Sequence, residues 1–348
     1  NLDLGQLAMG NLVFPPAPAA LGPNILGTGC FAFTAPADAA LSAALPLPRT
    51  FTSNFNDNEL IYTGKVSYEF ASPVTVYASF THGYKSGGFN LDSTAAIPVN
   101  GVSDPRFLSE TVDAYEVGFK GKFLDNAVTL NIAGFIEEFQ NFQVLEFTGA
   151  QFVTFNVPKV KSSGVEIEMV ARPDDNFTFN GGLTYTDARY PGDCAGTQTA
   201  ANVLNLCGHS LTNAPKFVGI AGATYDRDLG DSMKFFVNAQ VRMESDRRTS
   251  TQAIVVPNAA AIAAAGGVQA AVDAAPLNAF DIQDGTYKIN MRAGIADIDG
   301  AWGVEAWVTN LTNEITRGVT FNTVLRSGSR STFVQEPRMY GLTLRGKF

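Results

Sequence analysis

Few residues of this sequence have the types and spacing that catalysis or metal binding requires. His82 and His209 are the only histidines, and neither has a second ligand at a metal-binding spacing. The stretch "GYKSGGF" (Gly83 to Phe89) contains a glycine pair, but it follows a strand and leads into a loop, so a phosphate-binding loop is not expected. A Gly-x-Ser-x-Gly motif is absent from the sequence. The sequence therefore predicts no catalytic residues, no metal site and no enzyme activity.

The cysteines indicate an oxidising compartment. Cys194 and Cys207 lie in one segment rich in turn formers, "PGDCAGTQTAANVLNLCGHS". A loop disulfide between them is favoured, and closing a loop of this length contributes about 3 kcal/mol. Two unpaired thiols are the alternative. Cys30 has no assigned role, and a zinc site with His209 lacks the paired ligand spacing.

The composition is that of strands and turns. Only 16% of the 348 residues are charged, against roughly 25% in a typical soluble domain, while the chain holds 26 Phe, 10 Tyr and 33 Gly. The net charge of −9 argues against a nucleic-acid partner, for which a basic surface is expected. The first residues lack the pattern of a signal peptide, and the Ala-rich stretch from Ala253 to Val272 is too interrupted for a transmembrane helix.

Apolar and polar residues alternate in segment after segment from about Glu59 onward. Val117 and Phe119, for example, share one face of a strand, while Glu116 and Lys120 share the other. The pattern predicts about eleven strands, joined in turn by five tight turns and five long loops.

Two of the long connections stand out in this pattern. A longer loop is expected between Phe147 and Lys159, where the alternation breaks. An Ala-rich insert, with room for a short helix, is expected from about Ser250 to Asp284.

The length and chemistry of the strands favour a membrane barrel. Many run to ten to fifteen residues, about twice the usual length in soluble proteins, and tilted strands of this length cross a hydrocarbon layer. Their apolar faces suit lipid, and the charges on the opposite faces, including Glu166 and Arg242, suit a wide aqueous lumen. Backbone groups in lipid must be paired internally, so the strands must close. The sequence predicts an all-β fold, an antiparallel up-and-down transmembrane β-barrel of the outer membrane.

The chain is expected to have two parts. Residues 1–58 are rich in Pro, Ala and Gly and are interpreted as an exterior loop or an incomplete upstream segment, and residues 59–348 as barrel. The chain ends on an alternating strand with an apolar face, which is typical of the closing strand that the barrel assembly machinery reads as an insertion signal. The residues assigned to this signal are Tyr340, Leu342, Leu344 and Phe348.

Several stretches resemble, in order, the C-terminal barrel half of TonB-dependent outer-membrane receptors, most fully the siderophore and iron-complex type. They include "VYASFTHGYKSGGFN", "SETVDAYEVGFKGKF", "NVPKVKSSGVEIEM", "WVTNLTNEITRG" and "RMYGLTLRGKF". The resemblance implies half of a barrel of about 22 strands. It also implies an outer membrane with lipopolysaccharide as the surroundings, and TonB as a partner through a plug domain. No plug or TonB-contacting box is found in this sequence.

Membership of such a family implies energy-dependent uptake of a scarce nutrient, most simply a ferric siderophore. Iron is then expected only as part of the transported chelate. No cofactor of the protein itself is expected. Aromatic and cationic side chains at exterior strand ends suit an anionic, ring-bearing chelate, although each also has a structural explanation as a loop-packing residue. The candidate substrate-binding residues are Tyr84, Lys85, Phe89, Asn90, Arg247 and Arg248. A passive porin and a surface anchor acting through the Ala-rich insert are the alternatives.

Overall fold

A computed structural model gives the fold of the chain. It describes residues 54–70, 73–90, 97–99, 102–104, 106–147, 152–192, 203, 206–252, 257–324, 326 and 328–347. Of the predicted upstream segment, residues 1–58, only residues 54–58 are therefore described. None of the described helices is long and apolar enough to cross a membrane.

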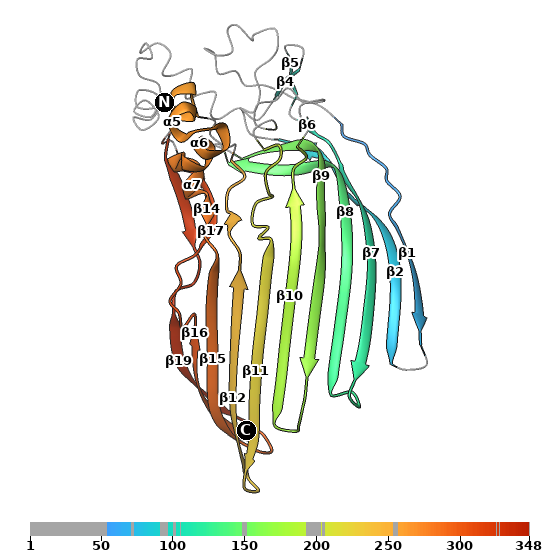
Figure 1. The fold of residues 1–348 in the computed structure, drawn as a ribbon, viewed down its shortest axis with the longest axis vertical. Helices are drawn as coiled ribbons and strands as arrows, with labels where there is room; N and C mark the ends of the chain where they lie inside the picture. The colour runs from blue at the N-terminus through green and yellow to red at the C-terminus, as the bar shows by residue number, and fades with distance from the viewer. Residues whose placement is uncertain are drawn as a thin grey trace.

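An antiparallel sheet of eleven strands dominates the structure (Figure 1). The strands pair in the order β1-β2-β7-β8-β9-β10-β11-β12-β15-β16-β19, so the main strands follow one another as neighbours. Their bounds are β1 (Tyr62–Glu69), β2 (Val74–Lys85), β7 (Glu110–Phe123), β8 (Val128–Phe147), β9 (Phe152–Ala171), β10 (Phe177–Arg189), β11 (Phe217–Leu229), β12 (Met233–Glu244), β15 (Thr286–Asp297), β16 (Trp302–Thr309) and β19 (Met339–Gly346). The predicted all-β class and the up-and-down order of eleven strands are confirmed.

Shorter elements lie in the connections. The Ala-rich insert forms three short helices, α5 (Ala259–Ala265), α6 (Val268–Ala274) and α7 (Pro276–Phe280). The Asn258 side chain caps α5, which ends at Gly266 in the left-handed conformation. Four two-stranded sheets are made by β3 (Gly88–Phe89) with β6 (Arg106–Phe107), β4 (Ile97–Val99) with β5 (Val102–Asp104), β13 (Arg247–Arg248) with β14 (Ile282–Gln283), and β17 (Arg317–Asn322) with β18 (Arg330–Val334).

The connections differ between the two ends of the sheet. Tight turns join the strands at the end where the C-terminus lies, and longer connections gather at the other end (Figure 1). The turn from β7 to β8 is built on three residues with positive φ, Leu124, Asp125 and Asn126. Short turns face the periplasm in outer-membrane barrels, so the end with the long connections is the exterior end.

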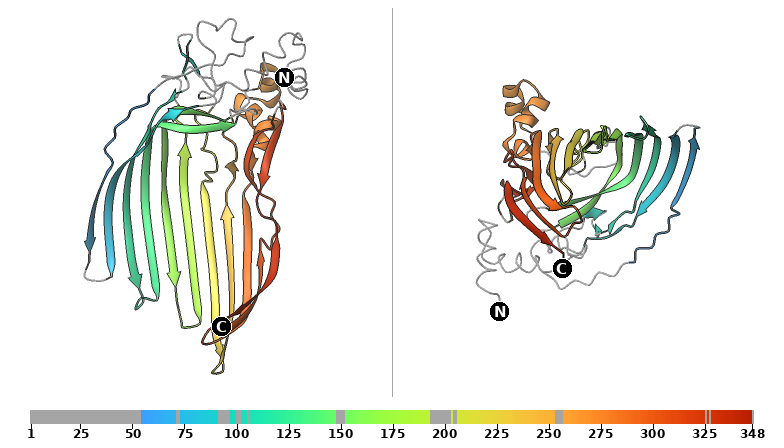
Figure 2. Two further views of the ribbon diagram at one scale, coloured as in Figure 1. Left: turned by 180° about the vertical axis from the view of Figure 1, so that it is seen from behind. Right: turned by 90° about the horizontal axis from the view of Figure 1, so that it is seen from below.

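The longer loop predicted between Phe147 and Lys159 is wrong. Strands β8 and β9 instead stay paired as far as Phe147 opposite Phe152. The pairing skips one position, where Asn141 has a φ of 52° and lies level with Pro158, which has no N–H to donate. We call residues 141–147 and 152–158 the strap, because these parts of β8 and β9 leave the plane of the sheet and cross its concave side (Figure 2).

The sheet is strongly curved, and its two faces differ as predicted. Polar-face residues such as Asp226, Arg292 and Glu305 line a hollow of about 430 Å³, which places this face on the concave side. On the opposite face apolar side chains are exposed, among them Val66 at 69% and Val117 at 63%. Such exposure suits contact with lipid rather than water.

Large side chains on the concave face lie over glycines of the neighbouring strand. Tyr77 lies opposite Gly118 in the pairing of β2 with β7, and a Cβ at Gly118 would come within 2.3 Å of the Tyr77 ring. Phe236 covers Gly294 in the same way, where a Cβ would lie 2.8 Å from the ring. The rings occupy the space that a side chain at these glycines would need, an arrangement known to compensate for glycine in strands.

The apolar core of the described residues lies at the exterior end. Val144, Phe155, Val157 and Val160 of the hairpin pack against the connection after β10, chiefly Tyr190. The connection also contributes two further buried residues, Val203 and Leu206. The strap and the connection after β10 therefore support each other.

The last described strand bears three of the four residues assigned to the insertion signal. Tyr340, Leu342 and Leu344 are 81%, 75% and 77% exposed on the outward face of β19. Phe348 lies outside the described residues. The role of these residues in insertion stays a prediction.

Candidate functional site at the exterior end

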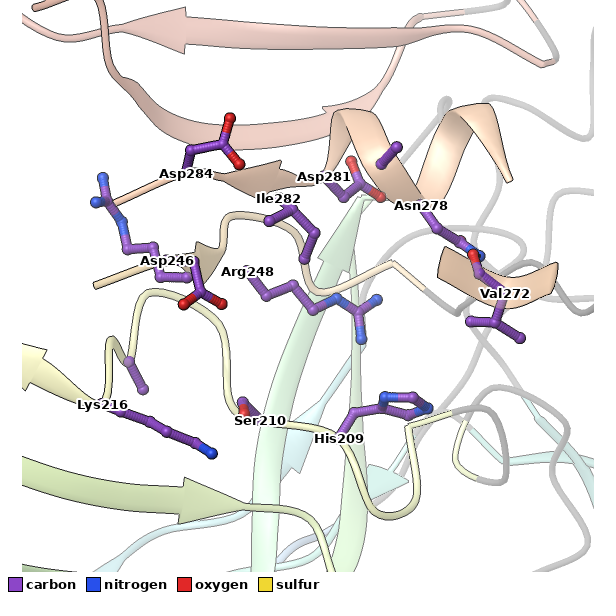
Figure 3. Close-up of a pocket in the computed structure, with 13 residues that line it drawn as sticks. His209, Ser210, Lys216, Asp246, Arg248, Val272, Asn278, Asp281, Ile282 and Asp284 are labelled. Atoms are coloured by element: carbon purple, nitrogen blue, oxygen red, sulfur yellow. The ribbon is translucent and has the colours of Figure 1, made fainter. Parts of the chain in front are cut away.

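A cavity of about 620 Å³ lies at the exterior end of the sheet (Figure 3). Three parts of the chain surround it: the segment from His209 to Lys216, the segment after β12, and the end of the helical insert. Its volume is in the range of small-molecule sites. The lining residues are His209, Ser210, Ala214, Lys216, Asp246, Arg247, Arg248, Val272, Asn278, Ala279, Asp281, Ile282 and Asp284.

Arg247 and Arg248, two of the predicted binding residues, form β13 and are buried, at 7% and 8% exposed. Arg247 is fully engaged within the protein. Its Nη1 lies 2.6 Å from Oε2 of Glu244, its Nε donates to Asn213, and its Nη2 donates to the carbonyl of Arg317. Arg247 therefore acts first as a link between three exterior segments.

Arg248 is held differently. Its Nη2 donates to the carbonyl of Gln252, while its Nη1 is buried and has no hydrogen-bond partner among the described residues. Burial lowers the pKa of Arg248, and the carboxylate of Asp281 opposes this effect. A buried guanidinium donor left unpaired is costly, because its hydration is lost without replacement.

A second buried arginine lies close to this group. Arg330 of β18 pairs with Asp281 at 3.2 Å, and both side chains are less than a tenth exposed. Asp281 also accepts from the hydroxyl of Thr320, while its carbonyl accepts from the hydroxyl of Thr249. This network was not predicted from the sequence, since Asp281 follows the short helix α7 and Arg330 begins the short strand β18, and no periodicity indicates that these residues meet.

The end of β8 at Phe147 contacts the same network. Gln252 donates its side-chain Nε2 to the carbonyl of Phe147 at 2.7 Å, and the Phe147 ring packs against Phe321. Burial raises the pKa of Glu146, and Arg330 and Arg248 oppose that rise. The strap therefore crosses to the exterior segments that carry the buried arginines.

The other four predicted binding residues lie elsewhere, around the end of β2 and the start of the next connection. The Tyr84 hydroxyl donates to Asp57, and Lys85 is exposed at the end of β2. Phe89 makes an edge contact with Phe55. The described lining of the cavity includes only Arg247 and Arg248 of the six predicted residues, so the structure does not gather all six at one site.

Asn90 has a clear structural role. It is 7% exposed, and its side-chain amide donates to the carbonyl of Thr154 and accepts from the Thr154 N–H, both at 2.7 Å. Asn156 makes a similar pair of contacts with the backbone of Leu108. These two amides fasten the connection after β2 to the strap.

Cys207 is disulfide-bonded. Cys194 lies outside the described residues, so the pairing of the two stays a prediction. Within the described ranges there is no group of three or more His, Cys, Asp or Glu side chains placed to hold a metal ion.

Comparison with known proteins defines the class. The family described as "TonB dependent receptor-like, beta-barrel" matches residues 38–323, which is most of the chain. The chain belongs to this family, as the ordered strand motifs predicted, and it is part of an outer-membrane β-barrel. The match begins inside the segment that sequence analysis placed before the barrel.

Individual relatives are more distant. The chain is 26% identical over 183 residues to a probable TonB-dependent siderophore receptor, PiuA of Acinetobacter baumannii, in a match covering 50% of this chain and 23% of the relative. The ferric yersiniabactin uptake receptor FyuA of Yersinia pestis has a similar fold, with a TM-score of 0.63 at 16% identity over 84% of this chain and 38% of that one. The copper transporter OprC is also similar, with a TM-score of 0.56 at 14% identity over 81% of this chain and 39% of that one. The chain thus spans well under half the length of these proteins, and at such low identity the structures show the fold alone.

Proposed function

We propose that this chain is part of a receptor that takes up a ferric chelate across the outer membrane with energy supplied through TonB. The observation that carries the proposal is the family match over most of the chain, joined to an exterior cavity with buried cations. The name of the PiuA relative, a probable siderophore receptor, supports iron complexes as the substrate class. The likeness to both a siderophore receptor and a copper transporter means that the fold leaves the substrate open.

The proposed contacts with substrate fall into two groups. Arg247 and Arg248 line the cavity and supply positive charge for an anionic chelate. Tyr84, Lys85 and Phe89 lie at a separate exterior position, where aromatic and cationic groups suit a ring-bearing ligand. Asn90 is better explained as a structural residue, because the oxygen and the nitrogen of its side-chain amide both hydrogen-bond to the backbone of Thr154.

The partners follow from the same proposal. Energy coupling requires TonB and a plug within the lumen, and the curved polar face of the sheet suits a polar plug. Lipid and lipopolysaccharide would surround the apolar face, and the barrel assembly machinery would insert the barrel.

The test is uptake of a radiolabelled ferric chelate by cells that express the complete gene. We expect deletion of the gene, or of TonB, to abolish accumulation at nanomolar chelate, and the intact gene to restore it. A purely structural anchor would leave uptake unchanged after deletion of the gene. Accumulation that depends on the gene but not on TonB would establish a passive channel instead.

A further inference from the structure

The strap has one buried face and one open face. Residues that lie opposite each other in β8 and β9 share a face, so Val144 and Phe155 lie on one side of the strap, and Leu145 and Phe152 lie on the other. Val144 and Phe155 are each 3% exposed, whereas Leu145 and Phe152 are 54% and 57% exposed. At this level of the strap, one side therefore meets packed protein and the other side is open.

Most of the strap cannot leave its position without exposing the exterior core. Phe155 and Val157 belong to that core, together with Tyr190 of the connection after β10. The connection after β2 adds Asn90, whose amide hydrogen-bonds twice to the backbone of Thr154. Moving segments of proteins are drawn from parts with few buried contacts, and this part of the strap has many.

The end of the strap is held by one buried side chain, that of Gln252. Gln252 is 3% exposed, and its side-chain Nε2 donates to the carbonyl of Phe147 at 2.7 Å. Its Oε1 accepts from Asn322 of β17, and its backbone carbonyl accepts from Arg248. Its backbone N–H donates to the hydroxyl of Ser250. All the polar groups of Gln252 are thus used, and they join the strap to the segment after β12 and to β17.

We propose that the strap keeps its position across the concave side throughout substrate uptake (Figure 2), and that Gln252 is the positioning residue that holds its end there. This inference rests on the proposed function. A substrate would then pass the strap on the side of Leu145 and Phe152, because the exterior core fills the opposite side. The strap thus limits the route into the lumen without acting as a moving gate.

The first experiment fixes the end of the strap and measures uptake by cells. The ring centroids of Phe147 and Phe321 lie 5.9 Å apart, so the double variant Phe147→Cys with Phe321→Cys of the complete receptor is joined by a short bis-methanethiosulfonate linker that reductant cleaves. Mass spectrometry of the joined peptides confirms the linkage. The probes are ferrichrome, ferric citrate and ferric enterobactin with radiolabelled iron. We expect the joined receptor to take up its chelate at a rate within twofold of each single-cysteine variant.

Two outcomes of this experiment would overturn the proposal. Uptake that falls at least fivefold on joining and returns with reductant would show that the strap has to move. Cysteines that fail to join would show that the end of the strap does not rest against β17.

The second experiment removes the hydrogen bond from Gln252 to the strap. Gln252→Glu keeps the size of the side chain but replaces the donor to Phe147 with a carboxylate oxygen. In the purified complete receptor we expect the amides of residues 145–147 to exchange hydrogen at least tenfold faster. In cells we expect the KM for uptake to rise at least threefold with an unchanged maximal rate, because the chelate would meet a strap without a fixed position.

The matched control is Gln140→Glu, which makes the same change of charge on an exposed part of β8. We expect it to change either quantity less than twofold. If Gln252→Glu does not reach the outer membrane, Gln252→Met replaces it, since methionine keeps the packing and removes the side-chain hydrogen bonds. Equal effects at residues 140 and 252, or no effect at residue 252, would overturn the role of Gln252.

The two proposals fail in different ways. Cells that take up none of the three chelates through this gene would remove the proposed function, while hydrogen exchange in Gln252→Glu would still test what holds the strap. Uptake that depends on TonB but stops when the strap is joined to β17 would keep the receptor function and remove the fixed strap.

Discussion

The strand wall and the exterior region of this molecule are stabilised by different means. In the wall, cross-strand pairing runs along the strands, and the outward side chains remain exposed, as with Val117. In the exterior region, formed by the strap and the long connections, side chains pack into a core around Val157, which is 0% exposed. All nine buried apolar residues in the described part of the chain belong to this region or to the strand ends that meet it. The wall depends on lipid for its apolar surface, whereas the exterior region buries its own.

The largest expected effect follows from placing a charge in the exterior core. Val157→Asp would bury a carboxylate among apolar side chains and destabilise this region by about 4–5 kcal/mol. We expect the strap to become sensitive to protease while the wall keeps the gel mobility of a folded barrel. Limited proteolysis of the purified receptor in detergent measures this. Loss of the folded mobility at the same time would show that the two regions unfold as one unit.

This comparison also explains what the sequence could predict. In a strand with one apolar face, apolar and polar residues alternate with a period of two. The neighbours Glu116 and Val117 therefore predict a strand and its two faces without any knowledge of distant contacts. The strap contains Pro158 and breaks the alternation, so it resembles a loop although it is paired. The ion pair of Asp281 and Arg330 joins the end of α7 to the start of β18, two short elements far apart in the sequence, and no local sequence pattern predicts that contact. Arg247 and Arg248 were predicted as binding residues by their type and position, but their burial could not be predicted.

The second prediction tests the lipid-facing side of the wall. Leu130 lies on the apolar face of β8, and Leu130→Arg would place a charge in the hydrocarbon layer at about 2–4 kcal/mol. The next residue, Asn131, points to the polar face, where its amide contacts Glu168. Asn131→Arg is therefore the matched control, with an expected change under about 1 kcal/mol. Urea unfolding of both variants in lipid vesicles gives the two free energies.

Equal destabilisation by arginine at residues 130 and 131 would contradict the assignment of the two faces. Both faces of the strand wall would then have the same environment, either apolar or aqueous. The wall would no longer differ from the exterior region in having one face exposed to lipid.

A third effect belongs to the exterior region alone. Burial raises the pKa of the Tyr190 hydroxyl from 10.0 to about 12, with Arg248 opposing the rise. Tyr190 is 2% exposed. Between pH 10 and 12 the unfolded state therefore loses its proton while the folded state keeps it, and stability falls as the pH rises. The expected loss reaches roughly 3 kcal/mol above pH 12, and this residue causes no loss of stability below about pH 10.

The measurement is hydrogen exchange of the strap amides as a function of pH, corrected for the intrinsic rates. Tyr190→Phe keeps the packing and removes the ionisable group, so we expect the extra loss above pH 10 to vanish. A loss that persists unchanged in Tyr190→Phe would assign the pH dependence to another group.

The smallest effect returns to the wall, at the glycines covered by rings. A Cβ at Gly294 would lie 2.8 Å from the Phe236 ring and 2.5 Å from the carbonyl oxygen of Val304, so Gly294→Ala must displace both. We expect about 2 kcal/mol of destabilisation from this overpacking. Gly64, on β1, is the control, because a Cβ there would meet nothing within 4 Å. Gly64→Ala should be neutral or slightly stabilising, since alanine restricts the unfolded chain.

The double variant Gly294→Ala with Phe236→Ala separates steric crowding from a general need for glycine in the strand. If the ring is the cause, its removal restores most of the stability lost by Gly294→Ala, and the two changes are strongly non-additive in urea unfolding. If the two losses of stability are additive, the position of the Phe236 ring does not depend on the absence of a side chain at residue 294. The wall would then be held by its backbone pairing and by lipid, without close packing of side chains on its inner face.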